Sequence, residues 1–400
     1  MQSNHRAVAG VAILIMALGI NLKGIQAQEG VVQPTPGSLY AWGGPNEEGV
    51  LDAPAGNDFV AIAAGGLHNV AIRSDGSLIG WGFNGPDGRT DVPAGNDFVA
   101  VAAGIAHSLA LRSDGSVVGW GSNNAGQTTV PAGTYKAIAA AENYSLAVRM
   151  DGTLAGWGDT FYGATQVPSG SDFVAVAAGH FHGIALRSDG SVTVWLATRI
   201  YSNLDLFEQY QDLLYPPQGP FVAVSAGGHR NVALRLDGTL ADWGAFSQPA
   251  VPTGNNFVAI AAGAAHSLAL KSDGSLVGWG DNSLGQTEVP VGNGFVAIAA
   301  GTEHCLAIGP ELDPVALLKR LIDDVDAINL ANGIENAADA KLDNALDALL
   351  AENADQRQDA ANKLNSFINS VEAQRGKEIT DTDATHLINS AKRIIDKLLN

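Results

Sequence analysis

The side chains with the clearest potential for chemistry are histidines that recur at a regular interval along most of the chain. Tyr144 and Arg230 fill the equivalent position in two further places. The recurring histidines are His68, His107, His182, His266 and His304. Imidazole binds transition metals and passes protons between partners, so a metal site or a proton relay is one hypothesis. Whether these rings converge depends on the elements that carry them.

Those elements are seven copies of one repeat. The pattern Phe-Val-Ala-(Ile/Val)-Ala-Ala-Gly begins at Phe59, Phe98, Phe173, Phe257 and Phe295, with looser copies at Tyr135 and Phe221. After it come two variable residues, the histidine position, an apolar alternation, an Asp-Gly pair and a segment ending in Trp. All seven tryptophans of the chain mark this last segment: Trp42, Trp81, Trp120, Trp157, Trp195, Trp243 and Trp279.

A repeat of roughly 36 to 39 residues with three short strand patterns and no helical periodicity is typical of a propeller blade. The Asp-Gly pairs predict two-residue type I′ hairpins between the second and third strands. The Ala-rich first strand suits the crowded space near a central axis. We therefore predict an all-β seven-bladed propeller over residues 37–309, followed by a small all-α helical bundle.

The two ends of the repeat array are each incomplete. The segment around Trp42 has no first or second strand before it, and the last repeat stops at Gly309 without a Trp strand. Pairing these ends completes a seventh blade and removes the open sheet edges. The N-terminal strand is thus predicted to close the last blade.

A ring of blades changes the interpretation of the histidines. Residues at one position of every blade are spread around the ring and cannot all reach one ion. The five histidines are therefore expected to make structural hydrogen bonds, because buried polar groups need partners. The seven tryptophans are expected to pack between neighbouring blades.

The pattern at residues 103–121 and 262–280, Ala-Gly-x-x-His-Ser-Leu-Ala-Leu-x-Ser-Asp-Gly-Ser-x-x-Gly-Trp-Gly, resembles the regulator-of-chromosome-condensation repeat. The Gly-Gln-Thr-x-Val-Pro linkers at 126–131 and 285–290 are similar to those of secreted bacterial members, including a propeller that inhibits β-lactamases. This resemblance implies protein binding. The nucleotide-exchange and chromatin roles of the eukaryotic founder do not suit an exported, acidic chain.

The N-terminal segment has the pattern of a secretory signal: His5 and Arg6, an apolar run over residues 7–20, and Ile25-Gln26-Ala27. Residues 1–27 are predicted to be a cleaved signal peptide, which implies a secreted or periplasmic protein without stable membrane insertion. An uncleaved anchor is the alternative. The single cysteine, Cys305, allows no intramolecular disulfide.

The formal net charge of −19 argues against a nucleic-acid partner. Affinity for phosphate backbones requires clustered Lys and Arg, whereas residues 28–310 hold 24 acidic and 10 basic side chains and residues 311–400 hold 17 and 10. The expected partner is an extracellular protein or glycan, and the chain is expected to be a monomer.

Candidate contact residues come from the variable pair before each histidine position, which should lie on one face near the axis. Variation between fixed neighbours fits a scaffold that presents loops, and it equally fits a lack of constraint. Phe181 is the single aromatic or Arg anchor among them. The candidates are Leu67, Glu142, Asn143, His180, Phe181, His229, Thr302 and Glu303.

The repeat after Trp195 is irregular, because Phe173 and Phe221 are 48 residues apart. The extra segment, residues 198–220, is rich in aromatic side chains and forms either an amphipathic helix over one face or part of a degenerate blade that packs them inward. Its aromatic residues are further partner-binding candidates: Tyr201, Phe207, Tyr210 and Tyr215.

Catalysis has little support in the sequence. Gly-x-Ser-x-Gly, Walker, His-Glu-x-x-His and Cys-x-x-Cys motifs are all missing. Oxygen-rich loops at 122–124 and 281–283 lack the ligand spacing of a calcium loop and read equally well as turns. We expect no cofactor, no metal and no enzymatic activity. Paired carboxylates from distant blades keep a hydrolase or lyase open as the alternative.

The C-terminal ninety residues follow a different pattern. Asp313-Pro314 marks a helix start, and four amphipathic stretches follow near 314–331, 335–352, 354–375 and 381–399, punctuated by Gly333 and Gly376. Segments 341–346 and 364–377 resemble the FIMAH-type helical domain of secreted bacterial proteins, over residues 314–399. That resemblance implies attachment or assembly outside the cell.

Two classes of function follow from these patterns. The first is a secreted interaction scaffold for a protein or glycan. The second is a secreted hydrolase or lyase acting on extracellular polymers, or an inhibitor of a secreted enzyme such as a β-lactamase.

Overall fold

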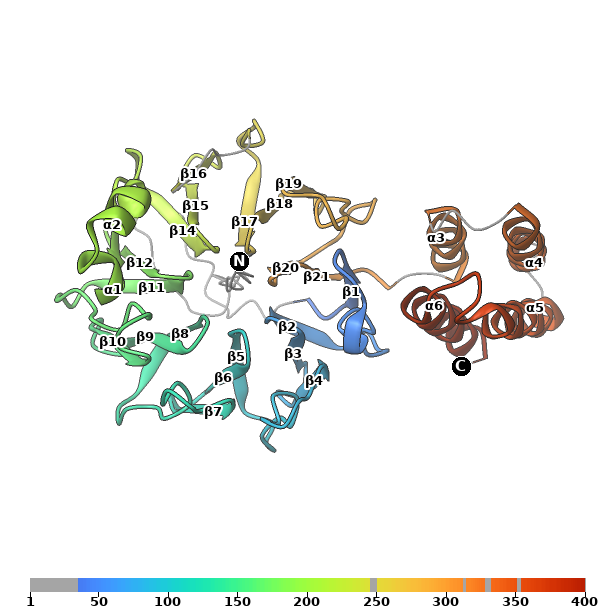
Figure 1. Ribbon diagram of the computed structural model, residues 1–400, viewed down its shortest axis with the longest axis horizontal. Helices are drawn as coiled ribbons and strands as arrows, with labels where there is room; N and C mark the ends of the chain where they lie inside the picture. The colour runs from blue at the N-terminus through green and yellow to red at the C-terminus, as the bar shows by residue number, and fades with distance from the viewer. Residues whose placement is uncertain (1–34, 245–249, 312–313, 328–331, 351–353, 400) are drawn as a thin grey trace. The chain divides into compact units, whose positions relative to one another are not determined.

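The structure is a computed structural model that describes residues 35–244, 250–311, 314–327, 332–350 and 354–399. The chain divides into two compact units, Met1–Pro310 and Glu311–Asn400. The predicted signal peptide, residues 1–27, lies outside the described residues. The first unit is a propeller and the second is a bundle of helices (Figure 1), so the predicted fold class is confirmed.

The propeller consists of seven separate three-stranded antiparallel sheets. Six are continuous in sequence and one combines β1 with β20 and β21. The blades, in chain order, are β2 Phe59–Ala64, β3 His68–Arg73 and β4 Leu78–Gly82; β5 Phe98–Ala103, β6 His107–Arg112 and β7 Val117–Gly121; β8 Tyr135–Ala140, β9 Tyr144–Arg149 and β10 Leu154–Gly158; β11 Phe173–Ala178, β12 His182–Arg187 and β13 Val192–Leu196; β14 Phe221–Ala226, β15 Arg230–Arg235 and β16 Leu240–Gly244; β17 Phe257–Ala262, β18 His266–Lys271 and β19 Leu276–Gly280; and β20 Ala297–Ala300 and β21 Cys305–Gly309 with β1 Ser38–Trp42.

The first strand of each blade lies closest to the axis (Figure 1), and first strands of successive blades contact one another around the ring. Strand β20 contacts β2, so the ring is closed. The alanines at the ends of these strands are almost fully buried, as Ala63, Ala102 and Ala139 illustrate at 0–1% exposure. Small side chains let seven strands converge where larger ones would collide.

Strand β1 completes the seventh blade. It pairs antiparallel with β21, in a register that sets Ser38 opposite Gly309 and Trp42 opposite Cys305. The Tyr40 hydroxyl donates a 2.9 Å hydrogen bond to the carbonyl of Pro310. Gly37 exchanges backbone hydrogen bonds with Phe59 of the first blade. The N-terminal strand therefore joins the last blade to the first.

The turns between second and third strands differ from the predicted type I′ hairpins. In the first blade, Gly76 has φ +82°, whereas Asp75 does not have the positive φ that a type I′ turn needs at both central residues. The Gly76 N–H donates to Arg73 O and the Arg73 N–H donates to Ser77 O. The loop is therefore longer, with glycine alone in the left-handed region. Asp75 accepts from the Ser77 backbone and hydroxyl instead.

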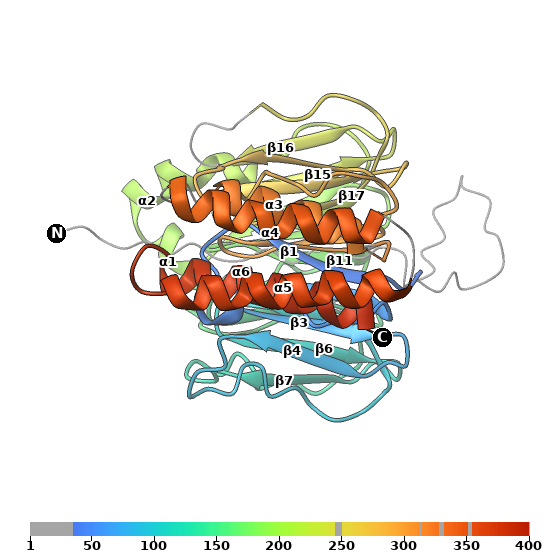
Figure 2. The same cartoon turned by 90° about the vertical axis from the view of Figure 1, so that its right-hand side faces the viewer.

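The aromatic-rich insertion forms three short helices after a complete fourth blade: α1 Thr198–Tyr201, α2 Leu204–Tyr210 and η3 Gln211–Leu214. All three strands of that blade pair, so the degenerate-blade interpretation is wrong. Ile200, Tyr210 and Leu213 pack with Leu196 and Ala197 in a small core of their own. Figure 2 shows α1 and α2 at one face of the propeller.

The described residues of the C-terminal unit form four helices: α3 Pro314–Ala327, α4 Asn332–Leu350, α5 Ala354–Gln374 and α6 Asp381–Leu399. One core joins all four, with Leu318, Leu342, Phe367 and Leu387 at 0% exposure. Gly376 has φ +70° between α5 and α6. Gly333, expected to separate two helices, lies instead in the first turn of α4.

Candidate interaction surface

The recurring histidines form a belt in which five of the seven blades are each linked to the next. In every case Nε2 reaches the residue that follows the histidine position in the next blade. His68 contacts Ser108 Oγ at 2.8 Å, His107 contacts Ser145 Oγ at 3.0 Å, and His182 contacts Asn231 Oδ1 at 3.0 Å. His266 contacts Cys305 Sγ at 3.1 Å, and His304 contacts Asn69 Oδ1 at 2.6 Å across the closure. We call this set the imidazole belt.

The partner side chain also fixes the tautomer of the ring. Ser145 Oγ donates to the carbonyl of Gln127 at 2.9 Å, so its oxygen accepts a hydrogen bond from His107 Nε2–H. Asn69 Nδ2 donates to Val50 O, which leaves its Oδ1 to accept from His304. His107 and His304 are therefore neutral Nε2–H imidazoles that donate to the next blade.

Burial lowers the pKa of every belt histidine. The pKa values fall to about 3 for His68, His107, His182 and His304, and to about 4 for His266. Removal from water is the largest cause in each case, because it disfavours the charged imidazolium. For His68 the neighbouring Arg89 guanidinium adds to the shift.

In the third blade, a tyrosine takes the place of the histidine and reaches the backbone directly. The Tyr144 hydroxyl lies 2.7 Å from the carbonyl of Gly179 and 2.8 Å from that of His182. No side-chain acceptor is needed in the next blade, and Gly183 stands where the other blades carry Ser, Asn or Cys. The longer side chain and the missing acceptor compensate for each other.

In the fifth blade, an arginine takes the place of the histidine and brings its own counter-ion. Arg230 donates to the Ala265 carbonyl at 3.3 Å and forms a salt bridge with Asp242, whose side chain is fully buried. Burial raises the pKa of Asp242, and Arg230 and the Trp279 indole oppose that shift. Ser267, which occupies the acceptor position, has no hydrogen-bond partner for Oγ among the described residues.

The tryptophans tie each blade to the loop before it. In five blades the indole N–H donates to a backbone carbonyl 30 or 31 residues earlier in the chain. In the seventh blade the indole N–H of Trp42 donates to Gln286 O at 3.1 Å. Trp279 donates instead to the Asp242 carboxylate at 2.9 Å. Six tryptophans are buried and Trp120 is partly buried.

Five of the predicted contact residues gather on one face, around the third to fifth blades. The His180 ring stacks on Phe181, with centroids 3.7 Å apart, and on His229 at 5.2 Å. Tyr210 of α2 lies against Phe181 and His229 at 5.8 and 5.1 Å. Glu142 pairs with His180 at 3.0 Å. His180 and Tyr210 are themselves buried, so this stacked cluster holds the helical insertion against the propeller.

Beside the stacked cluster lies an exposed aromatic patch, formed by Phe161, Tyr162, Arg199 and Tyr201. The Arg199 guanidinium lies over the Tyr162 ring at 4.7 Å, and its backbone N–H donates to Phe161 O at 2.9 Å. Phe161 and Tyr162 meet edge to face at 5.1 Å. Tyr201 contacts the half-buried Phe207 at 6.0 Å. The patch therefore joins a loop of the third blade to α1 of the fourth.

The sequence-based candidates did not include Phe161 or Tyr162. They follow Trp157 in the linker Asp159-Thr160-Phe161-Tyr162, where the linker after Trp279 reads Asp281-Asn282-Ser283-Leu284. That occurrence of two aromatic residues in place of Ser283 and Leu284 was the available signal.

The remaining candidates lie apart from this patch or at its margin. Tyr215 is exposed at the end of η3, and Asn143 is exposed beside Glu142. Leu67 and Thr302 are half-buried and Glu303 is exposed, in the loops of the first and seventh blades. The Thr302 N–H donates to Gly65 O, which joins those two loops.

The described part of the chain contains no group of three or more His, Cys, Asp or Glu side chains placed to hold a metal ion. Within the same residues, no helix has both the length and the apolar character needed to span a bilayer.

These features define a class of protein: a closed propeller of short repeats, each blade locked to the next by a buried polar side chain. The family model described as "Regulator of chromosome condensation (RCC1) repeat" matches residues 59–88, 98–127 and 257–286. The chain thus carries RCC1 repeats, as its sequence pattern predicted. No curated protein sequence matches it significantly.

Solved structures of RCC1 proteins share this fold. Prp20p from Saccharomyces cerevisiae, described with its binding to Gsp1p and histones, is 18% identical, with a TM-score of 0.55 over 72% of this chain and 94% of its own. Yeast RCC1 (Prp20) bound to Kap60 is 17% identical, with a TM-score of 0.54 over 71% of this chain and 91% of its own. Human WBSCR16 is 16% identical, with a TM-score of 0.53 over 76% of this chain and 99% of its own. Identities this low establish the fold alone.

Proposed function

We propose that this protein is an exported, non-catalytic interaction scaffold whose propeller binds a partner protein through the aromatic patch. The observation that carries the proposal is the distribution of exposed aromatic side chains. Phe161, Tyr162, Tyr201 and Tyr215, exposed by 43–66%, are all the strongly exposed aromatic residues in the described part of the chain. All four come from the two successive segments that follow Trp157 and Trp195, and Arg199 joins these segments to each other.

The composition of the patch supports protein recognition. Tyr and Arg are the side chains most often found at the energetic centre of protein interfaces. Leu204, 70% exposed at the start of α2, extends the apolar area next to Tyr201. Water-exposed apolar clusters of this kind are uncommon on proteins that lack a partner. Prp20p, which shares this fold, is described with its binding to Gsp1p and histones, and this supports a protein partner.

Export is the second part of the proposal and rests on the signal-like pattern of residues 1–27. The FIMAH-like C-terminal bundle would then serve attachment or assembly outside the cell. Fractionation of producing cells, with N-terminal sequencing of the mature chain, tests this part. We expect the protein in the extracellular or periplasmic fraction, beginning at Gln28; a cytoplasmic protein that retains residues 1–27 would overturn it.

The binding surface is tested by capture from the extracellular proteins of producing cells, with the mature chain as bait. Tyr162→Ala and Tyr201→Ala should each lose a specific partner that the unmodified chain retains. Met150→Ala and Leu236→Ala are matched controls, because they remove exposed apolar side chains elsewhere on the propeller. If the patch variants and the controls capture the same proteins equally well, the patch is not the binding surface.

A further inference from the structure

The C-terminal helical unit contains a cavity of about 250 Å³ where its four helices meet. Val325 of α3, Ala338 of α4, Phe367 of α5 and Leu387 of α6 all line it, so its wall is largely apolar. A cavity of about 150 Å³ holds benzene, and a water molecule takes about 30 Å³. The space is therefore large enough for an organic molecule of roughly ten non-hydrogen atoms.

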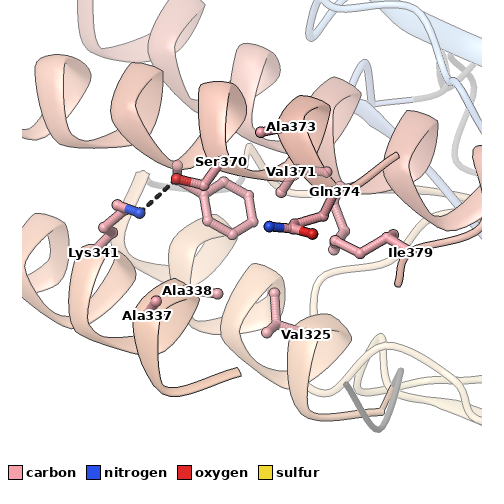
Figure 3. A pocket seen from close by; sticks show the side chains of 11 residues that line it. Val325, Ala337, Ala338, Lys341, Ser370, Val371, Ala373, Gln374 and Ile379 are labelled. Carbon is pink, nitrogen blue, oxygen red and sulfur yellow. Dashed lines mark hydrogen bonds between the residues drawn. The ribbon is translucent and has the colours of Figure 1, made fainter. Parts of the chain in front are cut away.

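One cationic group lies at this cavity. Lys341 Nζ lies 2.5 Å from Ser370 Oγ, which holds the ammonium between α4 and α5 (Figure 3). Lys341 forms no salt bridge with any carboxylate among the described residues, although residues 311–400 carry 17 acidic and 10 basic side chains. Lys363 of the same unit, by contrast, pairs with Asp359 at 2.7 Å.

A second polar group points into the cavity. Figure 3 shows the Gln374 side chain reaching into it from the end of α5. Its carboxamide makes no hydrogen bond to another described residue. The backbone beneath it is fixed, because Gln374 O accepts from the N–H groups of Lys377, Glu378 and Ile379 at 3.0–3.3 Å. The side chain therefore starts from a fixed backbone position, and its amide keeps its donors available.

We propose that this cavity binds a small monocarboxylate with an apolar body, such as a short fatty acid or an aromatic acid. The apolar wall would bury the body of the ligand. Lys341 and the Gln374 amide would receive the carboxylate, because the ammonium and the amide N–H groups are donors and a single ammonium matches one negative charge. This site belongs to the helical unit alone and does not depend on the function proposed for the propeller.

Titration calorimetry on the full chain tests the proposal with octanoate, 1-naphthoate and, as an uncharged analogue, octanol. We expect one site per chain for at least one of the two acids, and the tighter acid identifies an alkyl or an aryl body. Lys341→Met should weaken binding of the acid by about tenfold or more while leaving octanol binding unchanged. Lys363→Met, which removes a paired lysine outside the cavity wall, should bind as the unmodified chain does.

A second variant tests the cavity itself. Ala338→Phe adds a ring to its wall and should abolish binding of the acid, with helix content checked by circular dichroism. The proposal is wrong if neither acid binds at millimolar concentration, if Lys341→Met binds the acid unchanged, or if folded Ala338→Phe still binds it. Weaker binding of the acid by Lys341→Met and no binding by folded Ala338→Phe would show that the ammonium and the apolar space both contribute to the site.

Discussion

Acid should unfold the propeller cooperatively, because the imidazole belt titrates very differently in the folded and unfolded chain. In the unfolded chain the five rings take up protons near their ordinary pKa of 6.5, whereas in the folded chain they do so only near 3 to 4. Below pH 6.5 the unfolded state therefore binds more protons, and stability falls with falling pH. Above pH 6.5 the contribution of the belt is complete.

The size of the effect follows from the number of rings. Each ring changes the folding equilibrium by up to tenfold per pH unit, so five together cost about 7 kcal/mol per pH unit below their unfolded pKa. Domains of this kind have a total stability of about 5–15 kcal/mol. We therefore expect acid unfolding of the propeller at about pH 5, well above the range in which most carboxylates titrate.

Urea unfolding followed by tryptophan fluorescence measures this directly, since all seven tryptophans lie between residues 42 and 279. Between pH 6 and 5 the pH dependence of the unfolding free energy should correspond to four to five protons, by the linkage relation at about one proton per ring. His107→Gln should reduce that number by about one, and its stability at pH 8 isolates the packing cost. A dependence of fewer than about two protons would refute the buried neutral belt.

Three other perturbations test how the ring is held together. Deleting residues 36–45 removes the buried Leu39, Tyr40 and Trp42 and reopens the seventh blade, so a thermal melt should show a loss of about 5 kcal/mol; an unchanged melt would argue against closure by β1. Asp242→Asn leaves the buried charge of Arg230 without a counter-ion and should lower the free energy of unfolding, measured with urea, by about 3 kcal/mol. The double variant Arg230→His with Asp242→Gly restores the usual repeat residues and supplies Ser267 Oγ with a partner, so it should recover most of that loss. Trp195→Phe removes the 2.7 Å hydrogen bond to Ala164 O together with part of a buried indole, and should cost about 2 kcal/mol by the same assay; a loss below the error of measurement would leave both without a stabilising role.

The repeat pattern was sufficient to predict the propeller, because each strand has its own local signature and the seven copies reinforce one another. The hydrogen-bond partner of each histidine was not predicted. It lies in the next blade, one repeat away, and is set by the register between blades. The two blades without a histidine indicate this contact in the sequence, because each is accompanied by a second unusual residue: Tyr144 occurs with Gly183, and Arg230 occurs with Asp242.

The binding surface was predicted only in part, for a similar reason. His180, Phe181 and Tyr210 were identified from their positions in the repeat and the insertion. His180 and Tyr210 are buried, however, so they hold α2 against the propeller and are not available to a partner. Phe161 and Tyr162 become part of a patch only because Arg199 reaches them from the following blade. The cavity of the helical unit depends on how four helices pack, which hydrophobic periodicity does not specify.

The pairing of β1 with β21 also has a consequence for the order in which the protein folds. The hydrogen bond from Tyr40 to Pro310 joins residues 270 positions apart. The six continuous blades contain only local strand pairs and can form as their own residues become available, whereas the seventh must wait for the far end of the array. Until then β1 presents an unpaired edge, and ring closure is the late, slow step at which neighbouring chains would compete for that edge.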